Sequence, residues 1–68
     1  MTSEETLTTR ELEILQFITD GYTDREIAEE LSLSDKTVST HRKNILRKLK
    51  LKNTALLIRH AIENKLVK

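Results

Sequence analysis

Two similar helix-start signals follow each other closely in this 68-residue chain, and they limit its first half to short helices. Thr8 is followed three residues later by Glu11, and Thr23 is followed by Glu26 in the same way. This pattern is typical of a capping box, in which both side chains satisfy backbone N–H groups at a helix N-terminus. Gly21, just before the second signal, favours a left-handed residue that closes the first helix.

A third start signal comes soon after the second. Ser34 can cap a helix that begins at Asp35, whose negative charge suits the positive end of a helix. Only residues 32–34 separate this helix from the one before it, which is the spacing of a helix-turn-helix. Asn53 is a suitable cap for a last helix. The predicted helices cover residues 9–20, 24–31, 35–49 and 54–65.

The composition favours an all-α fold, because helix formers dominate a chain with no Pro and a single Gly. We predict one four-helix, bundle-like domain with a helix-turn-helix over residues 7–68, after a flexible leader or linker stub at residues 1–6. The absence of Cys excludes disulfides and thiolate metal sites. No apolar run approaches the roughly 20 residues of a membrane span, and the acidic first residues do not resemble a signal peptide. We therefore expect a soluble, cytoplasmic protein.

The net charge of +1 hides a division of charge along the chain. Residues 1–34 contain two basic and nine acidic residues, a net charge of −7, whereas residues 35–68 contain ten basic and two acidic residues, a net charge of +8. Such asymmetry indicates an anionic partner. The alternative is that the two halves attract each other or that their charges are simply solvated.

The third predicted helix, 35–49, has two different faces when its residues are placed on a helical wheel. Its apolar residues fall on one side, where they can anchor the helix to a core, and they are Val38, Ile45, Leu46 and Leu49. The other side is basic and carries short hydroxyl side chains. Its residues are Lys36, Ser39, Thr40, Lys43 and Arg47.

This second face suits duplex DNA. An α-helix fits the major groove, small Ser and Thr side chains permit close approach to bases, and Lys43 can donate to guanine. Lys36 and Arg47 can reach the flanking phosphates. We expect several of five cations to neutralise phosphates, and these five are Lys36, Lys43, Arg47, Lys48 and Lys52. A basic but merely solvated helix is the alternative, which the preceding short capped helix and three-residue turn make less favourable.

Five motifs, spread in order along the chain, together resemble one family. They are LTTRE at 7–11, GYT at 21–23, EIA at 26–28, KTVSTH at 36–41 and NILRKL at 44–49. The match, from about Leu7 to Val67, resembles the LuxR/NarL/FixJ (GerE-like) helix-turn-helix DNA-binding domain of bacterial transcription regulators.

The resemblance implies residue roles. The third helix would enter the major groove, with base contacts from Ser39, Thr40 and Lys43. Phosphate contacts would come from Thr23, Lys36, Thr37, Asn44 and Arg47. The fourth helix would form a homodimer, and its candidate dimer face comprises Leu56, Arg59, His60 and Glu63. The alternative for Leu56 is that a single exposed Leu has no such role.

The chain departs from the family pattern at three places. Lys50 stands where many relatives have Gly, and a left-handed Lys there would cost on the order of 1 kcal/mol. Thr54 stands where relatives often have Arg. Asp24 stands where a neutral Asn is frequent, and an acid beside the candidate phosphate contact Thr23 argues against that contact.

Catalysis and metal binding have little support in the sequence. His41 and His60 lie far apart without a helical His partner, so we expect no metal site, and we expect no cofactor. His41 is expected to pack partly under its helix, and the acids of the first two helices are expected to be solvated. The function we predict is sequence-specific duplex DNA binding in transcription regulation, as the output domain of a response regulator and not as an enzyme. The alternative is a helical interaction module that resembles a sigma-factor promoter-reading domain and acts through RNA polymerase.

Overall fold

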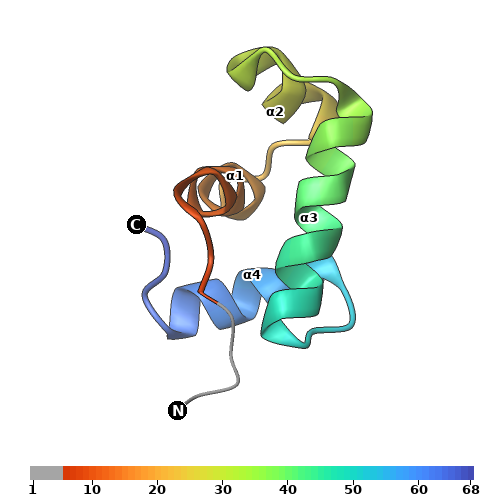
Figure 1. Cartoon of the computed structure of the whole chain (residues 1–68). Coiled ribbons are helices and arrows are strands. Elements are labelled where there is room, and N and C mark those ends of the chain that lie inside the picture. Colours follow the sequence, from red (N-terminus) through yellow and green to blue (C-terminus); the bar gives the residue numbers. More distant parts are fainter. Residues whose placement is uncertain (1–5) are drawn as a thin grey trace.

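The computed structural model describes residues 6–68, which form four α-helices (Figure 1). They are α1 (Thr9–Thr19), α2 (Asp24–Leu31), α3 (Asp35–Leu49) and α4 (Thr54–Glu63). The predicted all-α class is confirmed. The predicted leader falls outside the described residues except for Thr6. None of the helices in the described part of the chain has the length and hydropathy that a membrane span requires.

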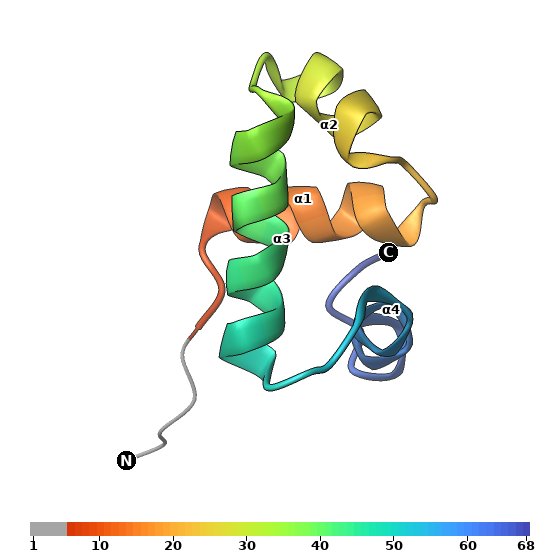
Figure 2. The same cartoon turned by 90° about the vertical axis from the view of Figure 1, so that its right-hand side faces the viewer.

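The longest helix, α3, lies across α1, and Figures 1 and 2 show it from two sides. α2 packs at the N-terminal end of α3, whereas α4 lies beside the C-terminal half of α3. α1 packs against each of the other three helices. Within residues 6–68, no helix covers one long side of α3 (Figures 1 and 2).

The helix starts are those that the sequence predicted. The hydroxyl oxygen of Thr8 accepts a hydrogen bond from the Glu11 N–H at 3.1 Å, and the Thr8 N–H donates to Glu11 Oε1 at 2.8 Å. Thr23 and Glu26 form a second capping box with the same two distances. Ser34 and Asn53 cap α3 and α4 through their side chains.

Two helix ends differ slightly from the prediction. α1 ends at Thr19, because Asp20 is its C-cap and Gly21 follows in a left-handed conformation with φ of 92°. α4 ends at Glu63 and not at residue 65. The Asn64 side-chain amide donates to the His60 carbonyl at 2.9 Å. Lys65 adopts a left-handed conformation with φ of 54°, so the right-handed helix cannot continue through it.

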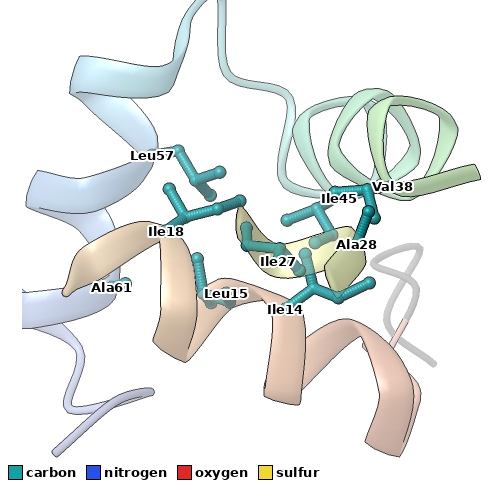
Figure 3. Close-up of a cluster of buried hydrophobic side chains, with 9 residues drawn as sticks. All are labelled: Ile14, Leu15, Ile18, Ile27, Ala28, Val38, Ile45, Leu57 and Ala61. Atoms are coloured by element: carbon teal, nitrogen blue, oxygen red, sulfur yellow. The ribbon is translucent and has the colours of Figure 1, made fainter. Parts of the chain in front are cut away.

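The core is a single apolar cluster to which all four helices contribute (Figure 3). It comprises Ile14, Leu15, Ile18, Ile27, Ala28, Val38, Ile45, Leu57 and Ala61. α3 therefore buries only Val38 and Ile45, and the predicted anchors Leu46 and Leu49 pack against the cluster while half-buried. Ile62 of α4 is 57% exposed. It lies on the wheel beyond the sector that Leu57 and Ala61 occupy.

The turn between α2 and α3 contains a left-handed residue that the sequence did not reveal. Ser32 has φ of 57° and ends α2, and the Leu33 N–H donates to the Ala28 carbonyl at 2.8 Å. Lys50 ends α3 in the same conformation, with φ of 58°, at the position where the family resemblance implies Gly in many relatives.

Candidate nucleic-acid interface

The basic face of α3 lies opposite the residues that anchor this helix. Val38 and Ile45 are fully buried, so the opposite side of the helix faces solvent. Of the candidate base contacts, Thr40 and Lys43 are exposed, and Ser39 is half-buried at the edge of this face. All three fall on consecutive turns of one helix, which brings them to a common surface.

The candidate phosphate contacts border the same surface. Lys36, Thr37 and Arg47 are exposed on α3, and Asn44 is half-buried. Thr23 is exposed at the start of α2, where its hydroxyl oxygen accepts the capping hydrogen bond. Because a hydroxyl that accepts one hydrogen bond can still donate its own hydrogen, the cap leaves Thr23 able to contact an anion.

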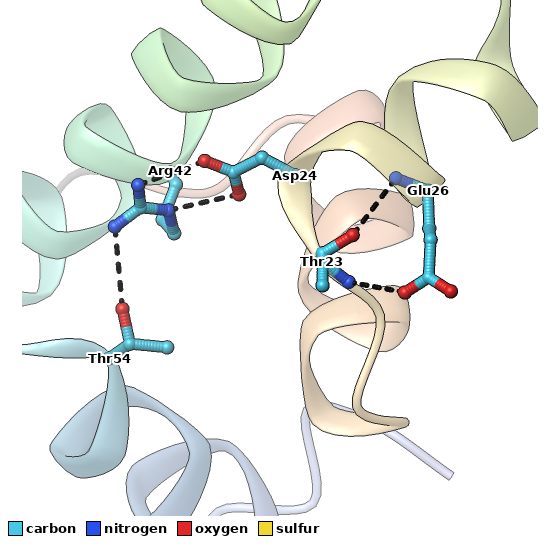
Figure 4. Close-up of polar contacts among 5 residues, drawn as sticks. All are labelled: Thr23, Asp24, Glu26, Arg42 and Thr54. Carbon is cyan, nitrogen blue, oxygen red and sulfur yellow. Dashed lines mark hydrogen bonds and ion pairs between the residues drawn. The ribbon is translucent and has the colours of Figure 1, made fainter.

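Arg42 connects three helices, and this connection explains the acid beside Thr23. Its guanidinium donates from Nε to Asp24 Oδ1 at 3.2 Å and from Nη2 to Asp24 Oδ2 at 2.9 Å (Figure 4). Nη1 donates to Thr54 Oγ1 at 3.4 Å. Asp24 therefore neutralises a cation of α3, and its charge is directed at Arg42.

A second ion pair joins α3 to α1. Lys48 Nζ lies 2.7 Å from Glu11 Oε1, and the two side chains are 15% and 5% exposed. The expectation that the acids of the first two helices are solvated is thereby wrong for Glu11, which is buried. Lys48 is half-buried and held by α1, so it does not belong to the exposed cations of this region. Neither could be read from helical periodicity, because the two residues lie far apart in the sequence.

The surroundings of Glu11 favour its ionised form. Burial alone would raise the pKa of this carboxyl group, but the hydrogen bonds from Lys48 and Thr8 and the positive charge of Lys48 outweigh burial. The pKa of Glu11 is therefore lowered from its ordinary value. The same oxygen accepts from the Thr8 N–H and from Lys48, so the first capping box is also the attachment point of α3.

The remaining cations of this region are exposed. Between residues 36 and 52, Arg42 and Lys48 are half-buried and paired with acids of α2 and α1. The exposed ones are Lys36, Lys43, Arg47, Lys50 and Lys52. Among the described residues, two ion pairs thus join the acidic half to α3, and exposed cations form a basic surface on α3 and on the turn that follows it.

The candidate dimer face of α4 is mostly exposed. Leu56 is 40% exposed, Arg59 pairs with Glu63 across one helical turn at 3.1 Å, and His60 is half-buried beside Asn64. His41 is half-buried on α3. Within residues 6–68 no three His, Cys, Asp or Glu side chains are grouped as they would be to hold a metal ion.

Comparison with known proteins gives consistent matches. The family model described as "Bacterial regulatory proteins, luxR family" matches residues 5–61. The chain is 53% identical over 60 residues to the "Uncharacterized response regulatory protein YgeK" of Escherichia coli (strain K12), covering 88% of the chain and 41% of that protein. It is 48% identical over 61 residues to the "Oxygen regulatory protein NreC" of Staphylococcus carnosus (strain TM300), covering 90% of the chain and 28% of that protein. The chain thus spans less than half the length of these relatives.

Proposed function

The chain belongs to the luxR family of bacterial regulatory proteins, as its motifs predicted, and we propose that it binds duplex DNA sequence-specifically to regulate transcription. In this proposal it is the output domain of a response regulator that acts in the cytoplasm. The relatives that it resembles include proteins named as response regulatory and oxygen regulatory proteins, and each is longer than the matched part. This supports an output module within a longer chain.

The exposed face of α3 is the observation that carries the proposal. It combines cations with short hydroxyl side chains on a helix whose opposite side is anchored, next to a short helix and a three-residue turn. That is the arrangement in which a recognition helix enters the major groove. Ser39, Thr40 and Lys43 would then contact base edges, because they lie on the first three turns of α3, where a recognition helix is deepest in the groove.

The flanking polar residues would hold the helix in register on the DNA backbone. Phosphate contacts carry little sequence information but fix orientation. Lys36 and Thr37 start α3, and Asn44 and Arg47 follow further along it, so these residues would contact phosphates on either side of the groove. Thr23 would contact a phosphate from the start of α2, because Asp24 beside it is already neutralised by Arg42.

We further propose that two copies bind together through α4. The exposed Leu56 and the neighbouring Arg59, His60 and Glu63 form the contact face, and two copies related by two-fold symmetry would read two half-sites. RNA polymerase is a further candidate partner. Sedimentation of the chain with a duplex that carries one or two half-sites tests the dimer, since paired sites should be occupied cooperatively.

The test of the proposed function compares Lys43→Ala with Arg47→Ala by selecting preferred duplexes from a random pool at fixed salt. Lys43→Ala should cost roughly 1–3 kcal/mol on the preferred duplex and relax the preference at one base position. Arg47→Ala should weaken binding to all sequences about equally. If Arg47→Ala changes the preferred sequence and Lys43→Ala does not, α3 is rotated from the proposed orientation.

The salt dependence of binding gives an independent check. Each phosphate that a cation neutralises releases condensed counterion, so four or five contacts imply a log–log slope of about −4. Lys48 should contribute nothing to this slope because Glu11 holds it. A slope near zero, or binding without any sequence preference, would instead favour an interaction module that acts through a protein partner.

A further inference from the structure

Arg42 is placed on α3 between the residues proposed to read bases and the body of the domain. It follows Ser39 by three positions and directly precedes Lys43. Its side chain is 27% exposed and that of Asp24 is 31% exposed, so both are partly withdrawn from solvent. Figure 4 shows its guanidinium between Asp24 of α2 and Thr54 of α4, with each of its three nitrogens directed at one of these two residues.

The apolar anchors of α3 are Val38 and Ile45, with Leu46 and Leu49 packed half-buried against the core, and polar contacts add to them in setting the rotation of the helix. Only Val38 and Ile45 of this 15-residue helix are fully buried. Apolar contacts are not directional, so they define poorly the angle at which the opposite face is presented. A bidentate pair between a guanidinium and a carboxylate has fixed geometry, because both groups are planar and two parallel hydrogen bonds must form together.

The two anchors of Arg42 come from the helices that precede and follow α3 in the chain. Asp24 is the first residue of α2, and Thr54 is the first residue of α4. A rotation of α3 about its axis would break the hydrogen bonds to one or both residues. The same pairing directs the positive charge of Arg42 at Asp24 and keeps it from the phosphate-binding set.

We propose that Arg42 is a positioning residue for base reading, and that Asp24 and Thr54 are the two anchors through which it sets the rotation of α3. This rests on the proposed function.

The first experiment measures affinity for the selected duplex and for random duplex, and the salt slope, with Arg42→Lys and Arg42→Gln. Lysine keeps the charge but not the bidentate geometry. Both variants should bind the selected duplex about five- to tenfold more weakly than the wild type. This loss lies at the lower end of the discrimination that one base contact contributes. Random-duplex affinity should stay within about twofold, and the salt slope should not flatten, because Arg42 does not release counterion.

Matched variants separate positioning from general effects of charge or stability. Arg10→Gln removes an equal charge from an exposed pair on α1 and should change neither duplex affinity. Thr54→Val removes only the hydroxyl group at nearly constant volume, and it should lower selectivity by a smaller factor than the Arg42 variants do. Far-UV circular dichroism at the assay temperature checks that each variant is folded. The Thr54 variant keeps the proposal testable if the Arg42 variants unfold.

The second experiment removes the anion that holds Arg42. Asp24→Asn should release the guanidinium toward the DNA backbone, so random-duplex affinity should rise and the salt slope should steepen by up to about one unit. Selectivity should fall at the same time. Asp20→Asn is the matched control, because Asp20 is an exposed acid at the end of α1. Among the described side chains, its carboxylate accepts hydrogen bonds only from Gln16.

The outcomes distinguish this proposal from the proposed function. If Arg42→Gln flattens the salt slope by about one unit and weakens both duplexes equally, Arg42 is a phosphate ligand and the positioning role is wrong. If the wild type is selective and folded Arg42 and Thr54 variants are equally selective, the positioning role alone is wrong. A wild type without any sequence preference overturns the proposed function, and the positioning role with it.

Discussion

The two capping boxes permit a controlled measurement of what the ion pair between α1 and α3 contributes to stability. Glu11 and Glu26 make the same hydrogen bonds to Thr8 and Thr23, at 2.8 Å and 3.1 Å in each case. They differ in their surroundings, because Glu11 is 4% exposed and holds Lys48 whereas Glu26 is exposed. Replacing each by Gln keeps an acceptor oxygen for the cap and removes only the charge.

We expect Glu11→Gln to be the far more costly change. A hydrogen bond to a charged group contributes roughly 1.5–3 kcal/mol, and Lys48 can recover some hydration by shifting outward, so the expected loss is about 2 kcal/mol. Glu26→Gln should cost less than about 0.5 kcal/mol, as surface substitutions usually do. A domain of this size has a free energy of unfolding of about 3–10 kcal/mol, so the first loss is a large fraction of it.

Urea unfolding followed by circular dichroism measures both losses, and their pH dependence identifies the cause. Because the folded-state pKa of Glu11 is lowered, its contribution is complete above the ordinary carboxyl pKa of about 4.3 and is lost as pH falls through the lower folded value. The difference between wild type and Glu11→Gln should thus be constant near neutral pH and shrink below about pH 4. Equal losses for the two variants at pH 7, or a difference that persists in acid, would refute this account of the pair.

Three further predictions concern single backbone and cap positions, each measured as a free energy of unfolding in urea. Thr8→Ala and Thr23→Ala should each cost about 1 kcal/mol through loss of a cap while the preferred DNA sequence stays the same, and an unchanged free energy would mean that the caps contribute nothing. Lys50→Gly should raise stability by about 0.5–1 kcal/mol, because it relieves a left-handed φ of 58°, and a loss would show that the Lys side chain matters more than the strain. Gly21→Ala should lower stability by about 1–2 kcal/mol although no atom lies within 4 Å of the added Cβ, so a neutral result would exclude conformational strain at φ of 92°.

Features that depend on neighbouring residues could be predicted from the sequence. A capping box joins positions three residues apart, so Thr8 with Glu11 and Thr23 with Glu26 placed the starts of α1 and α2 correctly. The left-handed conformation of Lys50 was considered only through the family resemblance, which implies Gly at this position in many relatives. The all-α class and the four helices followed from the same local rules, and the ends of α1 and α4 were off by one or two residues.

Contacts between helices could not be predicted, because periodicity gives the side of a helix but not its neighbour. The pair of Arg42 and Asp24 joins residues 18 positions apart, and that of Lys48 and Glu11 joins residues 37 positions apart. Lys48 was therefore grouped with the exposed cations. Asp24 was interpreted as evidence against a phosphate contact at Thr23, because its pairing with Arg42 could not be predicted. The wheel did place Lys43 and Thr40 on the exposed side, but whether they contact bases stays a prediction.

The charge division of the chain can now be explained residue by residue. Attraction between the halves and attraction to a polyanion are not alternatives, because they use different side chains of one helix. Arg42 and Lys48 lie on opposite flanks of the apolar side of α3, where a half-buried cation without an anion would destabilise the fold, and acids from α2 and α1 neutralise them. The cations beyond these flanks are exposed and add to the field over the outer face of α3. Asp24 and Glu11 thus hold the helix that carries the basic surface, and the other described acids of the first half are exposed.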